Sequence, residues 1–347
     1  MLLIWLSVFI SSLLISLGLS KWWLHLALKY KILDKPDNDR KLHLFPRPFG
    51  GGIAVILAVI ISVLAATIFF PAARVEILNY KALGILLALI SVMLGGILDD
   101  LKSRRPSFQI FWPIAAAAIL IFSGVTIATI SRPGGGWWYL SAVPELAAAL
   151  SFLWLIGMSY ATKLYDGVDG LLTTQVAGAS MILFIVGNLY GLPLSFGNIL
   201  ALALLGGCLG FLFFNWHPAK MFLGEGGSLA LGLFLGIISI LSGAKLATAA
   251  LVMGLPILDV LWVMFRRKFV EKKPISLGDR KHLHHRLLNL GLTPPQTVTV
   301  LAGVSFLFGL ASLIASTWGK IIAFLILALL LTMFGLFLTV RKIRLDK

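Results

Sequence analysis

The stretch "LGILLALISVMLGGILDD", residues 83–100, is an unbroken apolar run that ends in two adjacent acids. A helix needs about 20 apolar residues to cross roughly 30 Å of hydrocarbon, and the run as far as residue 98 approaches that length. Ten further runs of this kind can be marked, near 2–19, 50–70, 108–130, 145–161, 171–190, 197–215, 227–243, 246–265, 297–316 and 319–340. The sequence therefore predicts an all-α polytopic membrane protein with about 10–11 transmembrane helices.

The composition agrees with this fold class. The chain has 347 residues, of which 59% are hydrophobic and 12% are charged, well outside the range of soluble globular proteins. Because the longest polar segment is only 266–296, we expect a single integral-membrane domain over residues 1–347. The first run lacks a basic start and a small-residue cleavage site, which favours a retained helix. The one cysteine, Cys208, lies inside a run, so no disulfide framework is available.

The net charge of +15 follows the membrane topology and does not indicate nucleic-acid binding. Five of the 29 lysines and arginines fall in one set of alternate loops, and the other 24 (29 − 5) fall in the opposite set and the C-terminal tail. The five are Arg74, Lys81, Arg132, Lys245 and Lys320. The positive-inside rule then places the N-terminus outside and the C-terminus inside the cytoplasmic (inner) membrane. The outer loops are short, as in "SRPGGGWWYL" (131–140), and we expect no site there.

The inner loops carry most of the acids, and we expect catalytic loops at about 31–49, 99–107, 160–170, 214–228 and 266–296. Asp99 and Asp100 end a span where an ionised carboxylate is costly unless a cation or water compensates it. Adjacent like charges raise that cost. Hard oxygen donors without cysteine suit Mg²⁺ or Mn²⁺. The alternative is a solvated pair matched by the neighbouring basic residues of "LKSRR" (101–105).

Two glycine-flanked acid motifs follow. In "DGVDG" (166–170), Asp166 and Asp169 would share one face if the segment is helical, although either could simply cap the next span. In "FLGEGGSLALG" (222–232), Gly224 and the helix start could hold phosphate while Glu225 takes a metal ion. Capping by Ser228 is the alternative for part of this motif.

The segment "HLHHR" (282–286) brings His282, His284, His285 and Arg286 together. Such a cluster can neutralise phosphates and donate hydrogen bonds to them. A basic loop held against anionic lipid remains an alternative, and a zinc site fits less well because the histidine spacing matches no common tetrahedral pattern.

Together these loops favour phosphoryl transfer at the cytoplasmic membrane surface, with a lipid phosphate as acceptor. A transporter or lipid flippase with an acidic cation site is the alternative, for which Asp259 in "GLPILDVLW" (254–262) is the best sign. A transferase acting on prenyl diphosphates or CDP-alcohols would need differently spaced acids.

The chain resembles the polyprenyl-phosphate N-acetylhexosamine-1-phosphate transferases (glycosyltransferase 4). The resemblance rests on "RK-x-H…P-x-GGG" (40–52), "GGILDD" (95–100), "DGVDG", "FNWHPAKMFLGEGGSLALG" (214–232) and "HLHHRLL" (282–288), in family order. "HLHHR" is similar to the WecA/TagO branch, and less to the MraY branch. The resemblance implies Mg²⁺-dependent transfer of GlcNAc-1-phosphate, or a related sugar phosphate, from a UDP-N-acetylhexosamine to undecaprenyl (polyprenyl) phosphate, with release of UMP, at the start of cell-envelope polysaccharide synthesis. A homodimer is left open.

The resemblance also implies roles for the acids. Asp99 or Asp100 would handle the lipid phosphate, as a base or as a metal-linked acid. Glu225 would occupy the position of the usual metal-binding aspartate. Asp166 and Asp169 would hold the nucleotide side of the donor.

Further roles come from the same resemblance. Phe222 would lie under the uracil ring. The residues expected to order the loops and bind phosphates are Lys41, Asn215, His282, His284, His285 and Arg286. The chain departs from the family pattern at Ser103, where the last acid of D-D-x-x-D is missing, and at Tyr160 and Lys163, which replace asparagines. Lys163 could instead meet a pyrophosphate oxygen.

Overall fold

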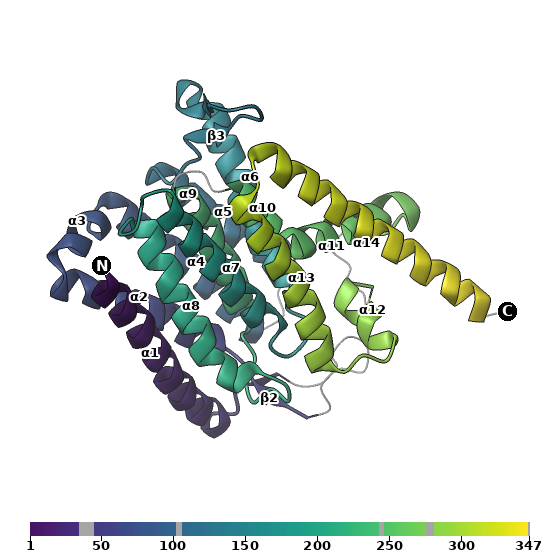
Figure 1. Cartoon of the computed structure of the whole chain (residues 1–347). Coiled ribbons are helices and arrows are strands. Elements are labelled where there is room, and N and C mark those ends of the chain that lie inside the picture. Colours follow the sequence, from purple (N-terminus) through teal and green to yellow (C-terminus); the bar gives the residue numbers. More distant parts are fainter. Residues whose placement is uncertain (35–44, 102–105, 243–245, 275–280, 346–347) are drawn as a thin grey trace.

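The computed structural model describes residues 1–34, 45–101, 106–242, 246–274 and 281–345 (Figure 1). It confirms the all-α polytopic fold, because eight helices in this part of the chain are long and apolar enough to cross a membrane. They are α1 (Leu2–Lys29), α2 (Gly51–Phe69), α4 (Tyr80–Leu101), α6 (Pro144–Tyr165), α7 (Leu171–Leu189), α8 (Phe196–Asn215), α13 (Pro294–Ile314) and α14 (Thr317–Leu345).

The other three predicted runs form shorter or broken helices. They are α5 (Pro106–Phe122), α9 (Glu225–Leu241) and the pair α10 (Leu246–Val252) and α11 (Gly254–Phe265), which is bent by 73°. The bend precedes Pro256, which lacks the N–H that a continuous helix would use at that turn. A continuous span over 108–130 is wrong. α5 ends at Phe122, and Gly124 then adopts a φ of +72°, which glycine accepts readily.

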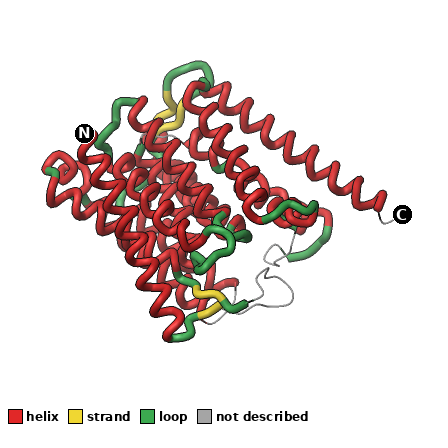
Figure 2. The backbone as a smooth tube through the Cα atoms, turned by 60° about the horizontal axis from the view of Figure 1, so that its bottom comes forward, coloured by secondary structure: helices red, strands yellow, loops and turns green. Residues whose placement is uncertain are grey.

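The remaining elements are short and lie at the helix ends. They are α3 (Pro71–Ile77), the 3₁₀ turn η1 (Leu140–Ala142), the π-helical turn η2 (Arg266–Val270), α12 (Leu283–Asn289), and the strands β1 (Leu33–Asp34), β2 (Arg47–Pro48), β3 (Thr129–Ser131) and β4 (Trp137–Tyr139). The antiparallel pairs β1–β2 and β3–β4 lie at opposite ends of the helix bundle (Figure 1). Figure 2 turns the β1–β2 end forward, where loops and strands gather below the helices.

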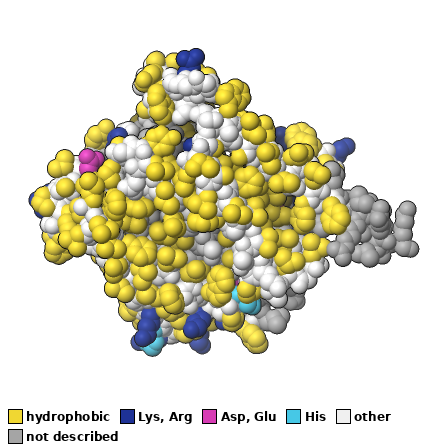
Figure 3. Space-filling model, in the orientation of Figure 1, with side chains coloured by type: hydrophobic (Ala, Val, Ile, Leu, Met, Phe, Trp, Pro, Cys, Tyr) yellow, Lys and Arg dark blue, Asp and Glu magenta, His cyan; other side chains and the backbone are white. Residues whose placement is uncertain are grey.

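The outer surface of the bundle is apolar. In Figure 3 hydrophobic side chains cover the middle of the visible face, whereas lysines, arginines and histidines gather at its lower edge. Inside the bundle, serines of α1 hold α8 through buried hydrogen bonds. Ser12 Oγ donates to Ala203 O at 2.6 Å, and Ser16 Oγ donates to Gly207 O at 2.7 Å. Hydroxyls facing a helix backbone are a usual means of helix association in membranes.

Four glycines, Gly52, Gly96, Gly226 and Gly227, form what we call the glycine seam, where α2 and α4 touch the start of α9. A Cβ on Gly52 would lie 2.1 Å from Gly227 Cα, and a Cβ on Gly96 would lie 2.0 Å from Gly226 Cα. The backbones are therefore in direct contact, which only glycine permits. The seam places the C-terminal end of α4 against the N-terminal end of α9.

Candidate active site

The glycine seam brings the acids at the end of α4 to the first residues of α9. Both carboxylate oxygens of Asp100 accept the backbone N–H of Glu225, each at 3.1 Å. A carboxylate at a helix N-terminus is favoured because it meets unpaired N–H groups and the positive end of the helix dipole. Gly224, which precedes the helix, has a φ of +80°, and a Cβ there would lie 2.7 Å from Asp100 Oδ2. The helix start expected to hold phosphate is thus held by Asp100 here.

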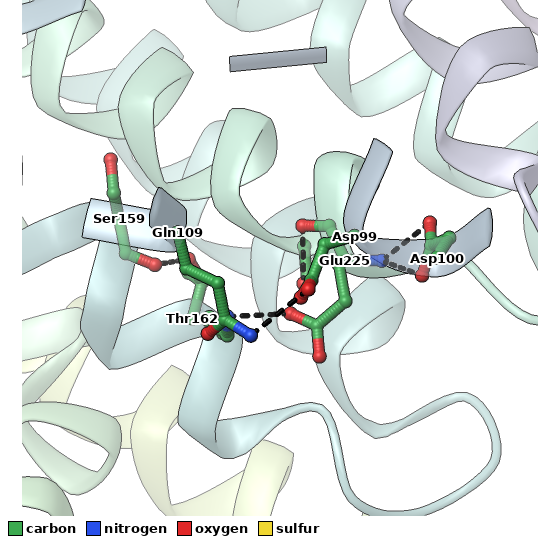
Figure 4. Close-up of polar contacts among 8 residues, drawn as sticks. Asp99, Asp100, Gln109, Ser159, Thr162 and Glu225 are labelled. Atoms are coloured by element: carbon green, nitrogen blue, oxygen red, sulfur yellow. Dashed lines mark hydrogen bonds and ion pairs between the residues drawn. The ribbon is translucent and has the colours of Figure 1, made fainter. Parts of the chain in front are cut away.

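A chain of polar contacts joins Asp99, on α4, to Glu225, on α9, through one residue of α5 and one of α6 (Figure 4). Gln109 Nε2, on α5, donates to Asp99 Oδ1 at 3.0 Å. Lys163 Nζ, on α6, lies 3.3 Å from Gln109 Oε1 and 2.8 Å from Glu225 Oε2. The Lys163 side chain is 13% exposed, so its charge acts in a partly dehydrated setting. This chain of contacts fixes the spacing between two acids that lie far apart in sequence.

The "DGVDG" loop lies between α6 and α7. Asp166 is the residue after α6, and Asp169 Oδ2 accepts the Ala219 N–H at 3.0 Å and lies 2.9 Å from His217 Nδ1. Neither acid caps the following helix, because the N-cap of α7 is Gly170, with a φ of +76° and no side-chain bond. The capping alternative is therefore wrong, and Asp169 instead holds the loop that leads to α9.

The electrostatics of this loop show that acids from separate segments lie close together. Burial above all raises the pKa of the Asp166 carboxyl to about 8. Three further carboxylates add to this rise through their negative charge, those of Glu225, Asp169 and Asp100. The acids of α4, α9 and the "DGVDG" loop therefore form one cluster at one end of the bundle.

The histidine segment packs against the same loop. His284 is buried, and a Cβ on Gly167 would lie 2.1 Å from its Nε2. Burial, with smaller effects from His285 and His282, holds the pKa of His284 well below its usual range. Its imidazole is therefore neutral at neutral pH. Arg286, two residues further on, lines a cavity of about 280 Å³ between α11, α12 and α14.

Asp259, the acid that favoured a transport pathway, has a local structural role. Its carboxylate accepts the Leu283 N–H at 2.9 Å and lies 2.8 Å from His282 Nδ1. Both Asp259 and His282 are buried. The pair fastens the start of α12 to α11, so the observation that best supported the transporter is explained by packing.

Other predicted binding residues order the loops near the acids. Asn215 accepts the Thr173 hydroxyl at 2.7 Å and donates to Met221 O at 3.1 Å. Phe222 is held through its backbone to the end of β2, since its N–H donates to Pro48 O at 2.9 Å. Lys41 lies outside the described residues.

Two contributors were missed in the sequence. Gln109 is a lone polar residue within the apolar stretch "FQIFW" (108–112), and that isolation was the available signal. His217 lies inside the family-like "FNWHPAK" motif but was given no role. The expected cap by Ser228 is wrong, because its hydroxyl donates to Glu225 O at 3.1 Å and the N-cap is Gly224.

The acid cluster has the donor chemistry of a hard-cation site. Its side chains supply only carboxylate oxygens, and burial, with a smaller contribution from their mutual repulsion, raises the pKa of Asp166. Within the described ranges no three acidic, histidine or cysteine side chains are already placed to hold a metal ion together. The Lys163 ammonium at 2.8 Å is the cation that Glu225 faces here. The residues fit a divalent ion in kind, and their side chains would have to rearrange to hold one together.

The fold and the site define a polytopic membrane protein with an acidic site at one end of its helices. The sequence pattern of glycosyl transferase family 4 matches residues 82–243. A Bacillus subtilis protein described as "Probable undecaprenyl-phosphate N-acetylglucosaminyl 1-phosphate transferase" is 32% identical over 326 residues, which cover 89% of this chain and 85% of that protein. The chain belongs to this family of glycosyl transferases.

Two other relatives mark different branches. The Mycolicibacterium smegmatis "Decaprenyl-phosphate N-acetylglucosaminephosphotransferase" is 29% identical, covering 78% of this chain and 72% of its own length. The Oceanobacillus iheyensis "Phospho-N-acetylmuramoyl-pentapeptide-transferase" is 31% identical, covering 76% of this chain and 82% of its own. The B. subtilis match covers more of both chains, which agrees with the expected WecA/TagO-like branch.

Proposed function

We propose that this protein transfers a sugar-1-phosphate, GlcNAc-1-phosphate or a related N-acetylhexosamine phosphate, from a UDP-sugar to a polyprenyl phosphate. The observation that carries the proposal is the single acid cluster formed by Asp99, Asp100, Asp166, Asp169 and Glu225 at one end of an apolar bundle. A lipid phosphate can reach this position while its hydrocarbon tail stays among the helices. The named activities of the relatives support the same reaction.

The reaction exchanges one phosphate linkage for another. An oxygen of the polyprenyl phosphate attacks the sugar-bearing phosphorus of the donor, a new P–O–P bridge forms, and the P–O bond to UMP breaks. Asp99 or Asp100 would position the attacking phosphate, and Asp166 and Asp169 would face the nucleotide side. Because both substrate and product are diphosphates, the step should be nearly isoenergetic and reversible.

Mg²⁺, or Mn²⁺ in its place, is part of the proposal. Such an ion supplies Lewis-acid stabilisation of phosphate oxygens when it is bound. Glu225 with Asp99 or Asp100 would hold it, since Asp99 is joined to Glu225 through Gln109 and Lys163, and Asp100 accepts the Glu225 N–H. Two pieces of the sequence would complete the substrate site, the Gly224 turn and the neutral His284 beside Gly167.

The charge distribution supports a position for the site at the cytoplasmic face of the inner membrane. We also propose the N-terminus outside and the C-terminus inside. The proposed pathway role is the first lipid-linked step of a cell-envelope polysaccharide. A homodimer is an open proposal that crosslinking in membranes would test.

The experiment incubates membranes containing the protein with undecaprenyl phosphate and a panel of UDP-sugars, followed by mass analysis of the lipid product. We expect a lipid diphosphate carrying one N-acetylhexosamine, release of UMP, and entry of labelled UMP into UDP-sugar when product is present. No lipid product with any UDP-sugar, or no UMP exchange, would contradict the proposal.

Asp100→Asn is the informative variant for the site. The asparagine oxygen can still accept the Glu225 N–H, so the fold is retained while the negative charge is lost. We expect turnover to fall by about a hundredfold or more with little change in melting temperature, as for loss of a group used mainly in the transition state. Full activity of this variant would remove Asp100 from the mechanism.

A further inference from the structure

A second cavity lies at the opposite end of the bundle from the acid cluster. Its volume is about 360 Å³, and it opens between the β3–β4 hairpin, the start of α10 and the turn from α13 to α14. The lining residues that matter here are Ser131, Arg132, Tyr190, Thr248, Trp318 and Lys320. In the part of the chain that the structure describes, no acidic side chain lines it. The proposed transfer reaction makes no use of this cavity.

Two cations in the cavity have no acidic partner among the residues that the structure describes. Lys320 is half-buried at the start of α14, and its Nζ donates to the buried Thr248 hydroxyl at 3.1 Å. Arg132 sits over the ring of Trp138, with 6.0 Å from the guanidinium carbon to the ring centre. A half-buried ammonium that meets only a hydroxyl keeps much of its desolvation cost. A bound anion would offset that cost.

The presence of two basic residues in this one cavity is unusual for the sequence. Only five lysines and arginines occupy the sparsely charged set of loops, and two of them, Arg132 and Lys320, line this one cavity. They come from segments almost 190 residues apart, so folding has brought them together. Lysine or arginine side chains, dark blue in Figure 3, also lie at the top of the view, where the β3–β4 hairpin ends the molecule.

The surroundings favour a lipid over a soluble anion. Trp318 and Tyr190 line the cavity, and Trp137 and Trp138 lie exposed on the neighbouring strand β4. Tryptophan and tyrosine typically occupy the headgroup level of a bilayer. α14 begins at the cavity and exposes apolar side chains such as Leu325 along its length. An acyl chain therefore has an apolar surface to lie against.

We propose that this cavity binds the phosphate of an anionic glycerophospholipid from the adjacent leaflet. Lys320 and Arg132 contact the phosphate, and the hydroxyls of Thr248 and Ser131 are in place to add hydrogen bonds. The acyl chains lie along α14. The inference is independent of the transfer reaction, because its residues lie at the other end of the helices.

The test is native mass spectrometry of the purified full chain, titrated with phosphatidylglycerol or, in a second arm, phosphatidylcholine. Lys320→Gln and Arg132→Gln are compared with Lys81→Gln, which removes a lysine from the same set of loops but away from the cavity. We expect roughly tenfold weaker phosphatidylglycerol binding for each cavity variant, the loss of one charge-assisted contact, and no change for the control. Arg132 is exposed on a hairpin, so its variant keeps the fold even if Lys320→Gln does not.

Three outcomes would overturn the proposal. Equal phosphatidylglycerol binding by the wild-type chain and Arg132→Gln would remove the cavity as the site. Equal binding of phosphatidylcholine would show that the charge of the lipid is not read. Displacement of phosphatidylglycerol by millimolar inorganic phosphate would show a soluble-anion site. Sugar-phosphate transfer, measured in parallel, should be unchanged in Arg132→Gln. A negative result for lipid binding can therefore be told apart from a negative result for the transfer reaction.

Discussion

Replacing Gly96 by alanine tests whether the glycine seam sets the geometry of the acid cluster. The new Cβ would lie 2.0 Å from Gly226 Cα and 2.1 Å from Gly226 N, both of them backbone atoms that cannot rotate away. Ordinary contact begins near 3.4 Å, so α4 and α9 must separate by about 1.4 Å. This movement carries Asp100 away from the Glu225 N–H, which it now meets at 3.1 Å.

A displacement of this size should affect chemistry more than folding. Misplacing reacting groups by about 1 Å can cost about a hundredfold in rate, whereas overpacking one methyl group costs about 1–3 kcal/mol of stability. We therefore expect Gly96→Ala to release UMP about a hundredfold more slowly while remaining folded in membranes.

Gly157→Ala is the matched control, because Gly157 lies within α6 and nothing stands within 4 Å of its added Cβ. It should retain wild-type turnover and gain up to about 1 kcal/mol of helix stability. Both variants are assayed for UMP release at equal protein, with thermal unfolding followed in the same membranes. Folded Gly96→Ala protein with wild-type turnover would refute the role of the seam.

The remaining predictions concern charge. Lys163→Met removes the ammonium that lies 2.8 Å from Glu225 and competes with a metal ion for this carboxylate. Because the pair is partly exposed, the Mg²⁺ concentration for half-maximal turnover should fall only roughly three- to tenfold. An unchanged Mg²⁺ requirement would contradict this prediction. The folded pKa of Asp166, about 8, exceeds its usual 3.8, so the folded chain holds a proton that the unfolded chain has lost. In EDTA, unfolding free energy should thus fall as pH rises from about 4 to about 8, and a pH series of melting curves should flatten in Asp166→Asn. Asp259→Asn weakens the hold on His282 and should cost about 1–3 kcal/mol, visible as a lower melting temperature and slower turnover.

The sequence predicted the membrane helices well because hydrocarbon burial leaves a direct record in apolar runs. α2, for example, spans Gly51–Phe69 where 50–70 was expected. Hydropathy could not locate the end of α5, since the apolar residues after Gly124 are equally compatible with the strand β3. The 73° bend between α10 and α11 was also missed, although Pro256 marks its place.

The site was predicted as a set of loops and not as a set of contacts. Alternation of spans places all inner loops on one side, so the gathering of Asp100, Asp166 and Glu225 at one end could be expected. Their individual partners could not, because the bond from the Glu225 N–H to Asp100 and the bridge through Gln109 depend on helix packing. The contact between His284 and Gly167 likewise joins segments that are remote in sequence.

The glycine seam also limits how the chain can vary. Where two backbones touch, a mutation can only add atoms, and any added atom forces the helices apart. Gly96 and Gly226 are both buried in this contact, and no residue smaller than glycine could make room on the facing helix. A change at one of these positions therefore has no compensating change at the other, whereas the surrounding loops are free of this limit.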